Sequence, residues 1–260
     1  MRLGTWNVNS ARTRIDRIVE VLTRHDLDVL AIQETKCRTD QFPIDPLREA
    51  GYDAATWGIN QWNGVAVISR VGLDDVTRGF PGQPTFRDTL EPRALGVTCA
   101  GVRVWSLYVP HGRGLTDPHM AYKLAWFEAL RAAVSQRLDD EPDLAMALVG
   151  DFNVAPLDSD VWDIAAFEGA THVSDAERQA FAALADAGLR EVSRDYAPGY
   201  TYWDYQKLRF PRNEGMKIDF AYASTALAQR VTGAVIDRDE RKGKGASDHV
   251  PLILDIADEA

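Results

Sequence analysis

Several apolar segments of this chain end in side chains that can bind metals or move protons. Asn7 and Asn9 follow the first such segment, and Gln33-Glu34 follows the second. Further along the chain come Tyr108, Gly150-Asp151-Phe152-Asn153, Asp219 and Ser247-Asp248-His249. Because strand ends in an α/β sheet meet at one edge, we expect these groups to converge on a single site.

The residue types favour a magnesium-assisted reaction at a phosphate group. Mg²⁺ prefers oxygen ligands and usually takes one or two carboxylates together with substrate phosphates, and no Cys/His cluster has the spacing of a zinc site. Cleaving a phosphodiester also requires charge neutralisation, an in-line water, a base and help for the leaving oxygen. Glu34 can hold the metal, His249 can polarise the water or hold the phosphate, and Asp151 can exchange a proton. Hydrogen bonds to phosphate oxygens can come from Asn7, Tyr108 and Asn153.

Each of these residues taken singly also has a purely structural interpretation. Asp151 beside Gly150 is typical of a turn, Tyr108 of a core aromatic side chain, and His249 of a structural histidine. Glu34 is harder to explain in this way, because burying a carboxylate without a partner costs several kcal/mol. The joint pattern at so many strand ends favours the chemical interpretation.

The elements that must position these residues follow from hydrophobic periodicity. We expect strands at Leu3–Val8, Asp28–Ile32, Gly64–Ser69, Ala94–Thr98, Val102–Val109, Leu144–Val149, Ile218–Tyr222, Val231–Ile236 and Val250–Ile256. Helices are expected where Ile15, Ile18, Val19 and Leu22 form one face, after the N-cap and proline Asp117-Pro118, and after the capping box Ser174–Glu177. The polar, aromatic stretch from Tyr196 to Gly215 is expected to be a long functional loop. Without a linker, we expect one α/β domain over residues 1–260, either a doubly wound sheet or a two-sheet sandwich.

Composition excludes several classes of protein and raises one objection. Of the 260 residues, 45% are hydrophobic, which is too many for a disordered chain, and no apolar run is long enough to span a membrane. The start of the chain has no secretory signal, and Cys37 and Cys99 cannot form a disulfide framework, so we expect a cytoplasmic protein. The net charge is −10, from 29 Lys+Arg and 39 Asp+Glu. Such a charge by itself argues against a nucleic-acid partner.

The ordered set of motifs nevertheless resembles the exonuclease III family of abasic-site DNA endonucleases, within the endonuclease/exonuclease/phosphatase superfamily. The matching pieces run essentially from end to end. They are Trp6-Asn7-Val8-Asn9, Gln33-Glu34-Thr35-Lys36, Gly64-Val65-Ala66, Tyr108-Val109-Pro110, Gly112-Arg113-Gly114, Gly150-Asp151-Phe152-Asn153, Thr201-Tyr202-Trp203-Asp204-Tyr205, Ile218-Asp219 and Ser247-Asp248-His249. The resemblance implies a DNase I-like, four-layered α/β sandwich of two packed mixed β-sheets flanked by helices.

The same resemblance implies an activity and its partners. It implies a metal-dependent DNA-repair phosphodiesterase that hydrolyses the backbone 5′ to abasic sites, with additional 3′–5′ exonuclease and 3′-phosphatase activity. The implied cofactor is Mg²⁺, with Mn²⁺ as a substitute. The implied partner is double-stranded DNA with abasic sites or blocked 3′ ends. The protein is expected to be a cytoplasmic monomer, nucleoid-associated if it is bacterial, with no membrane partner.

The resemblance also implies roles for individual residues. The catalytic group comprises Tyr108, Asp151, Asn153, Asp219 and His249, and the metal environment comprises Asn7, Asn9, Glu34, Asp151, Asn153, Asp248 and His249. Residues expected to face DNA are Lys36, Arg93, His111, Arg113, Lys207 and Lys217. Tyr202, Trp203, Met216 and Ile218 are expected to line an apolar pocket for an extruded abasic sugar, which has no stacking to lose. Lys217, Pro92 and His111 stand where family members usually carry other residues.

Two alternatives remain open from the sequence. One is another hydrolase of the superfamily, such as a non-specific DNase or an enzyme for a small phosphodiester. Such enzymes characteristically use a second histidine on the strand that here ends in Tyr108. The other is a catalytically dead DNA-binding protein, but Glu34, Asp151 and His249 are all retained.

The distribution of charge along the chain largely reconciles the net charge of −10 with a DNA partner. Basic residues concentrate in the segments Lys207–Lys217 and Arg238–Lys244, whereas Asp139, Asp140, Glu141 and Asp143 cluster elsewhere. We therefore expect a local binding face with a modest, salt-dependent affinity for intact DNA.

Overall fold

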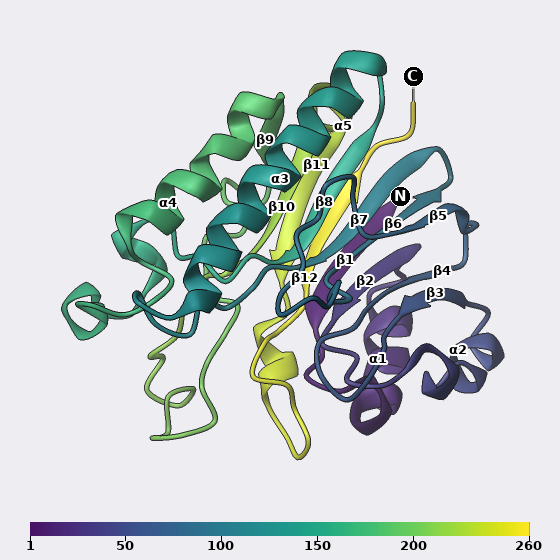
Figure 1. Ribbon diagram of the computed structural model, residues 1–260. Coiled ribbons are helices and arrows are strands. Elements are labelled where there is room, and N and C mark those ends of the chain that lie inside the picture. Colours follow the sequence, from purple (N-terminus) through teal and green to yellow (C-terminus); the bar gives the residue numbers. More distant parts are fainter. Residues whose placement is uncertain (260) are drawn as a thin grey trace.

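The apolar strands form two six-stranded sheets in the computed structural model, which describes residues 1–259 (Figure 1). Sheet A contains, in spatial order, β11 (Val231–Ile236), β12 (Leu252–Ile256), β1 (Arg2–Asn7), β2 (Val29–Gln33), β4 (Val65–Ser69) and β3 (Asp53–Trp57). Sheet B contains β5 (Asp74–Arg78), β6 (Ala94–Cys99), β7 (Val102–Tyr108), β8 (Met146–Asp151), β10 (Asp219–Ser224) and β9 (Leu189–Glu191). Each sheet is mixed, because β1 pairs with β2 and β7 with β8 in parallel, whereas the other neighbours are antiparallel.

Helices cover the outer face of each sheet, as Figure 1 shows. The α-helices are α1 (Ala11–Arg24), α2 (Asp45–Glu49), α3 (Pro118–Asp140), α4 (Asp175–Ala182) and the short α5 (Thr225–Ala228). Short 3₁₀ helices lie at Thr39–Gln41, Asp158–Asp160, Ile164–Phe167, Ala183–Ala187 and Arg238–Arg241. The predicted helix starts are confirmed: the Asp117 side chain accepts from His119 N, and Ser174 and Glu177 form a capping box.

Strand β2 shows why the central strands appear in the sequence as continuous apolar runs. Val29 and Ala31 belong to the core between the two sheets, whereas Leu30 and Ile32 belong to the core under α1 and α2. Successive side chains of a strand point to opposite faces, so a strand covered on both sides is apolar at every position. A third core, between sheet B and the helices α3 and α4, completes the layers. The four-layered sandwich implied by the resemblance is therefore confirmed, and the doubly wound single sheet is excluded.

Three strands were not predicted from the sequence. β3 and β9 are edge strands, and β5 is an edge strand whose residues are all exposed. An edge strand with an exposed face needs no apolar run, so hydrophobic periodicity does not reveal it. The predicted loop from Tyr196 to Gly215 is confirmed, since it contains no named helix or strand. Among residues 1–259, no helix has the length and apolar character needed to cross a membrane.

The sheet registers bring the polar strand ends to one edge. Asn7 pairs with Gln33 at the ends of β1 and β2, and Tyr108 pairs with Asp151 at the ends of β7 and β8. Asp219, the first residue of β10, pairs with Asp151 from the antiparallel side. Close packing also requires Gly150, because a Cβ atom there would lie 2.0 Å from Leu107 O. Long loops from both sheets extend beyond this edge, at the bottom of Figure 1.

Candidate active site

The expected catalytic side chains meet in a buried cluster at this edge. His249 Nδ1 lies 2.8 Å from Asp219 Oδ2, and His249 Nε2 lies 3.7 Å from Asp151 Oδ2. All three residues are at most 4% exposed. Two bonds to β1 hold the segment that carries His249: Trp6 Nε1 donates to His249 O at 3.0 Å, and Ser247 Oγ donates to Asn7 O at 2.7 Å. The imidazole is therefore fixed between two carboxyl groups that come from neighbouring strands.

Asn7 connects this cluster to Glu34. Its Nδ2 donates to Asp151 Oδ2 at 3.0 Å and to Glu34 Oε1 at 2.8 Å. Asn153 approaches Asp151 from the other side, since its backbone N donates to Asp151 Oδ1 at 2.9 Å. Each oxygen of Asp151 thus accepts a hydrogen bond, and the side chains contributed by sheets A and B form one network.

Burial and neighbouring charges together raise the pKa values of both Asp151 and His249. Burial raises the pKa of Asp151 to about 7, and the carboxyl groups of Asp219 and Glu34 act in the same direction. Burial alone would lower the pKa of an imidazole, but Asp219 and Asp151 outweigh it and raise the pKa of His249 to about 10. At neutral pH His249 is therefore a cation, and Asp151 is close to its midpoint, which suits a proton-transfer group.

Glu34 is held in its ionised form by a neighbouring lysine. Burial acts to raise the pKa of Glu34, but the Lys36 ammonium outweighs burial and lowers it. Lys36 Nζ lies 2.8 Å from Glu34 Oε2 and also donates to Asn9 Oδ1. Asn9 Nδ2 in turn donates to Asp248 Oδ1 at 3.1 Å. Oxygen-bearing side chains expected around the metal therefore lie together.

The donor chemistry of these residues fits Mg²⁺. Among residues 1–259, no three His, Cys, Asp or Glu side chains form an all-protein cage. Mg²⁺ does not require one, because it binds through one or two carboxylates and retains waters and substrate phosphates. Glu34 could supply such a carboxylate, and Asn7, Asn9 and Asp248 lie close by. His249 Nδ1 is bonded to Asp219 Oδ2 at 2.8 Å, and the predicted metal role of His249 stays a prediction.

Comparison with known proteins identifies the family. The sequence pattern of the Endonuclease/Exonuclease/phosphatase family matches residues 4–249. The chain belongs to this family. The resemblance seen in the sequence is thus confirmed.

Relatives of similar length support the same family. The chain is 29% identical over 263 residues to an exodeoxyribonuclease of Bacillus subtilis, covering 98% of this chain and 99% of the relative. A 3′ phosphatase from Neisseria, solved with a product DNA hairpin, superposes with a TM-score of 0.92 at 34% identity, covering 98% of this chain and 99% of the other. An AP endonuclease from Archaeoglobus fulgidus superposes with a TM-score of 0.91 at 29% identity, again covering 98% and 99%.

Arg93 was predicted to face DNA, and this prediction is wrong. In this family member Arg93 is 4% exposed and lies beneath Tyr108, with its guanidinium carbon 4.8 Å from the centre of the Tyr108 ring. Arg93 Nε donates to Glu91 Oε2 at 2.5 Å. Arg93 therefore supports Tyr108 from inside. Burial raises the pKa of Tyr108 well above its usual value, with Glu34 acting in the same direction, so its hydroxyl group keeps its proton.

The residues predicted to line an apolar pocket lie together, except for Trp203. Met216 and Ile218 pack with Val161 and Tyr202 in one small cluster. The Tyr202 ring also contacts His249, with centroids 4.9 Å apart, so the cluster adjoins the catalytic group. Trp203 is 1% exposed and packs against Tyr200 and Phe210 on another side of the loop. Its place in the pocket is a prediction that the structure corrects, because successive residues of an extended segment point in opposite directions.

Lys217 was also predicted to face DNA, and it is fully buried. Lys217 Nζ donates to Ala197 O at 2.9 Å and lies 5.1 Å from the centre of the Phe220 ring. The Lys36 side chain is 29% exposed, and His111, Arg113 and Lys207 are exposed at the surface, so these four remain candidates for DNA contact.

Burial of Lys217 predicts a specific pH dependence of stability. Burial lowers the pKa of Lys217 from 10.5 to about 8, so the folded state loses this proton before the unfolded state does. Stability from this group therefore rises between pH 8 and 10.5, by about 3 kcal/mol. In Lys217→Met that contribution is absent. Urea unfolding of both proteins at pH 8 and pH 10.5 measures the difference, and equal changes in the two would contradict the buried lysine.

Sequence reasoning missed three surface residues beside Lys36. Arg12, Arg38 and Trp62 line one hollow together with Lys36. The Trp62 side chain is 63% exposed, which is unusual for so large an apolar group. The sequence does contain a sign of this exposed side chain. Trp62 stands among the polar residues of Asn60-Gln61-Trp62-Asn63, where no helical or strand-like apolar pattern would bury it.

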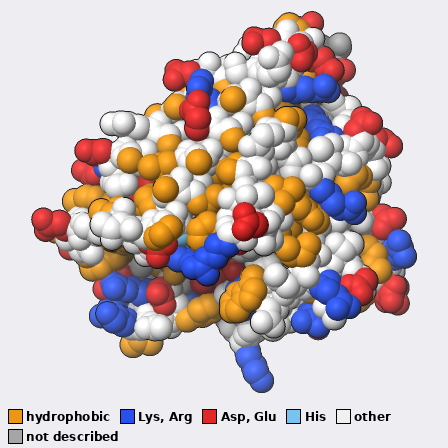
Figure 2. All heavy atoms as spheres, viewed as in Figure 1, with side chains coloured by type: hydrophobic (Ala, Val, Ile, Leu, Met, Phe, Trp, Pro, Cys, Tyr) orange, Lys and Arg blue, Asp and Glu red, His pale blue; other side chains and the backbone are white. Residues whose placement is uncertain are grey.

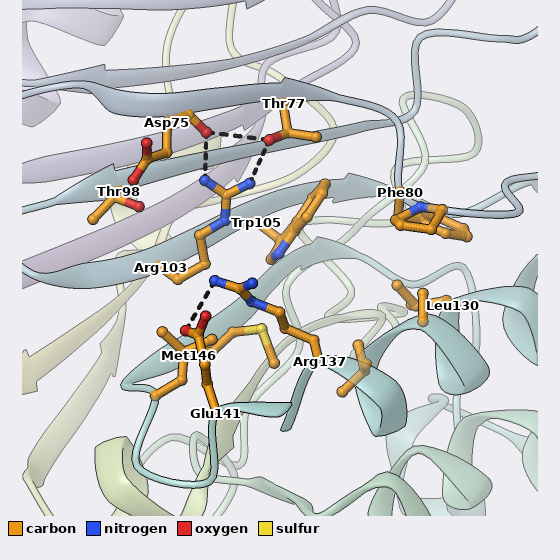
Figure 3. A pocket seen from close by; sticks show the side chains of 14 residues that line it. Asp75, Thr77, Phe80, Thr98, Arg103, Trp105, Leu130, Arg137, Glu141 and Met146 are labelled. Carbon is orange, nitrogen blue, oxygen red and sulfur yellow. Dashed lines mark hydrogen bonds and ion pairs between the residues drawn. The ribbon is translucent and has the colours of Figure 1, made fainter. Parts of the chain in front are cut away.

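One hollow of the surface is separate from the expected catalytic cluster. Figure 3 shows residues that line this hollow, among them Arg103, Trp105, Arg137 and Met146. Its volume is about 500 Å³. These residues come from the starts of β7 and β8 and from the second half of α3. The catalytic groups follow the opposite ends of the same strands, so this cavity is not the active site.

Proposed function

We propose that this chain is a metal-dependent DNA-repair nuclease that hydrolyses the backbone 5′ to abasic sites and removes groups from 3′ ends. The buried cluster of Asp219, His249 and Asp151 beside Glu34 carries the proposal. The names of the relatives agree with it: they include exodeoxyribonucleases, an AP endonuclease and a 3′ phosphatase. Abasic cleavage and 3′-end removal are both hydrolyses at phosphate and can share one centre.

Each side chain of the cluster has its own role in the proposed reaction. Asp219 orients the His249 imidazole, whose positive charge binds a phosphate oxygen. Asp151, with a pKa of about 7, gives or takes the proton of the attacking water or the leaving oxygen. Tyr108 and Asn153 lie beside Asp151 and position the phosphate. Glu34, with Asn7, Asn9 and Asp248 nearby, would hold Mg²⁺, which would neutralise charge on the phosphate when bound.

The small apolar cluster beside His249 suits an extruded sugar. Met216 and Ile218 offer no polar contact to a base, Tyr202 adds its ring to the same cluster, and an abasic sugar costs little to extrude. We further propose that the protein acts in the cytoplasm as a single-domain monomer on double-stranded DNA, with Mn²⁺ able to replace Mg²⁺.

The hollow lined by Arg12, Lys36, Arg38 and Trp62 is the proposed contact for the DNA strand beyond the active site. Arg12 and Lys36 offer positive charge to phosphates, whereas Arg38 is paired with Asp40. The exposed indole of Trp62 can stack on an unpaired base without regard to sequence. Figure 2 shows Lys and Arg side chains projecting from the lower edge of the molecule, where the loops of Figure 1 hang. A local basic face of this kind reconciles DNA binding with the net charge of −10.

Replacing Trp62 by Ala is expected to raise KM for duplex DNA roughly tenfold with little change in kcat, because one stacking contact is worth about 1–3 kcal/mol. Steady-state kinetics at low salt measure both constants. Tyr196→Ala is the matched control, since Tyr196 is 50% exposed but lies in another part of the surface. Equal effects of the two substitutions would contradict the proposed contact.

A panel of substrates tests the proposed function. Duplexes carry a single tetrahydrofuran abasic site, a recessed 3′ end, a 3′ phosphate or no lesion, each with Mg²⁺ and with chelator. We expect a metal-dependent nick 5′ to the abasic analogue and release at 3′ ends, with little cutting of intact duplex. Equal internal cutting of the intact duplex would favour a non-specific DNase, and absence of all cutting would favour a DNA-binding protein.

A further inference from the structure

Lys123 and Glu177 form a buried ion pair below the active site. Lys123 belongs to α3 and Glu177 to α4, two helices that lie side by side on sheet B (Figure 1). Lys123 Nζ lies 2.5 Å from Glu177 Oε1, and neither side chain is exposed at all. The free-energy cost of removing two charges from water is offset only when the pair has good geometry and makes further hydrogen bonds. The other groups that this pair binds therefore decide what it does.

Lys123 binds the two loops that follow β8 and β7. Its Nζ donates to Asn153 O at 2.6 Å and to His111 O at 3.3 Å. Asn153 has a φ of +51°, a left-handed conformation that is uncommon for a residue with a side chain. In this conformation Asn153 N donates to Asp151 Oδ1 at 2.9 Å, and Asn153 Nδ2 donates to Val109 O at 2.9 Å. Lys123 thus holds the carbonyl of the turn whose N–H binds Asp151.

Glu177 ties a third segment to the same point. Its Oε1 accepts from His172 N at 2.9 Å, and its Oε2 accepts from Ser174 Oγ at 2.6 Å. His172 is also left-handed, with a φ of +79°, and its ring packs edge-on against the His111 ring with centroids 4.7 Å apart. His172 O accepts from Ala155 N at 2.8 Å. The segments around His111, Asn153 and His172 are therefore joined through one buried pair of charges.

We propose that Lys123 and Glu177 are positioning residues for the reaction at Asp151 and Asn153. The pair fixes the left-handed Asn153 turn and so the direction of the hydrogen bond to Asp151, while neither side chain can touch DNA because both are fully buried. Stability alone does not explain the pair, since well-packed apolar side chains often replace buried ion pairs without loss. This inference rests on the proposed nuclease function, and it adds two residues to it.

The test compares Lys123→Met, Glu177→Gln and the double variant Lys123→Met/Glu177→Gln. Lys123→Met leaves a buried carboxylate without its partner, so its thermal midpoint should fall most. The double variant removes both charges at nearly constant volume and should recover much of the midpoint. The kcat of the double variant should remain roughly 10–100-fold below that of the parent protein, because Asn153 O and His111 O still lack their donor. Its KM should stay within about twofold of the parent value.

Leu30→Ala provides the stability control. Leu30 lies in the core under α1 and α2, so its replacement lowers the thermal midpoint without touching these loops. We expect an unchanged kcat for Leu30→Ala below its midpoint. If kcat of the double variant recovers together with its thermal midpoint, the pair is only structural and the inference is wrong.

Amide hydrogen exchange separates failure of this inference from failure of the proposed function. If the parent protein cuts no DNA, the proposed function fails, but exchange still tests the pair. Segments 109–114 and 152–156 should exchange faster in the double variant than in the parent, whereas β3 should be unchanged. Equal exchange of these segments in both proteins would overturn the positioning role regardless of activity.

Discussion

Replacing Asp151 by Asn is expected to lower kcat by roughly 10²–10⁴-fold, the range that a general acid or base contributes. An amide keeps the shape of the side chain and can still accept from Asn153 N, which lies 2.9 Å from Asp151 Oδ1. It cannot give or take a proton, whereas burial raises the pKa of Asp151 to about 7 and makes both forms available near neutral pH. Single-turnover cleavage at saturating DNA and Mg²⁺ measures the loss.

Asp139→Asn is the matched control for Asp151→Asn. Asp139 is exposed near the end of α3, so the same change of charge there should leave kcat within about twofold of the parent. The thermal midpoint of Asp151→Asn should not fall, because burying an ionisable carboxyl group among other carboxyl groups is itself costly. Retention of more than half of the parent kcat in Asp151→Asn would remove this residue from proton transfer.

Replacing Glu34 by Gln is expected to weaken Mg²⁺ binding more than roughly tenfold and to lower activity accordingly, with partial recovery at high Mg²⁺. Changes even outside the direct ligand set typically cost 10–100-fold in metal affinity. Lys36 keeps the pKa of Glu34 below its usual value despite burial, so the negative charge that attracts the cation is present at neutral pH. Calorimetric titration of Mg²⁺ into DNA-free protein measures the affinity independently of activity.

Glu20→Gln is the control for the metal prediction. Glu20 lies on the exposed side of α1, away from the network around Asn7, and its replacement should leave Mg²⁺ affinity unchanged. Chelation of divalent metals should abolish cleavage by the parent protein. Unaltered Mg²⁺ affinity in Glu34→Gln would mean that the metal binds elsewhere, and cleavage that persists in chelator would exclude the metal-dependent reaction.

Strands covered on both faces were predictable, and exposed edge strands were not. β2 and β8 are buried at every position, so each appears in the sequence as an unbroken apolar run. β5 is exposed at every position and forms only because β6 offers it backbone hydrogen bonds. Such a strand is stabilised by its neighbour rather than by burial of its own side chains. Hydrophobic periodicity in a single sequence therefore does not reveal it.

The same distinction applies to the candidate site. Glu34, Asp151 and His249 were predictable because polar residues at the ends of buried strands are chemically conspicuous. Arg93 and Lys217 were misplaced because a basic residue near a motif looks the same in sequence whether it faces solvent or the interior. Burial of Lys217 depends on Ala197 and Phe220, which approach it only in the folded chain.

The sequence by itself determined the α/β class, the family resemblance and the chemical types at the candidate site, because these follow from local apolar patterns and from short motifs. The apolar patterns left a doubly wound sheet and a two-sheet sandwich open, and only the motif resemblance favoured the sandwich. Only the tertiary structure decided that Asn7 links Asp151 to Glu34, with hydrogen bonds of 3.0 and 2.8 Å, since this link depends on how the two sheets pack. It also decided that Lys123 and Glu177 meet below Asn153. Contacts between residues distant in sequence depend on strand register and helix packing, and no local pattern encodes which partners these will bring together.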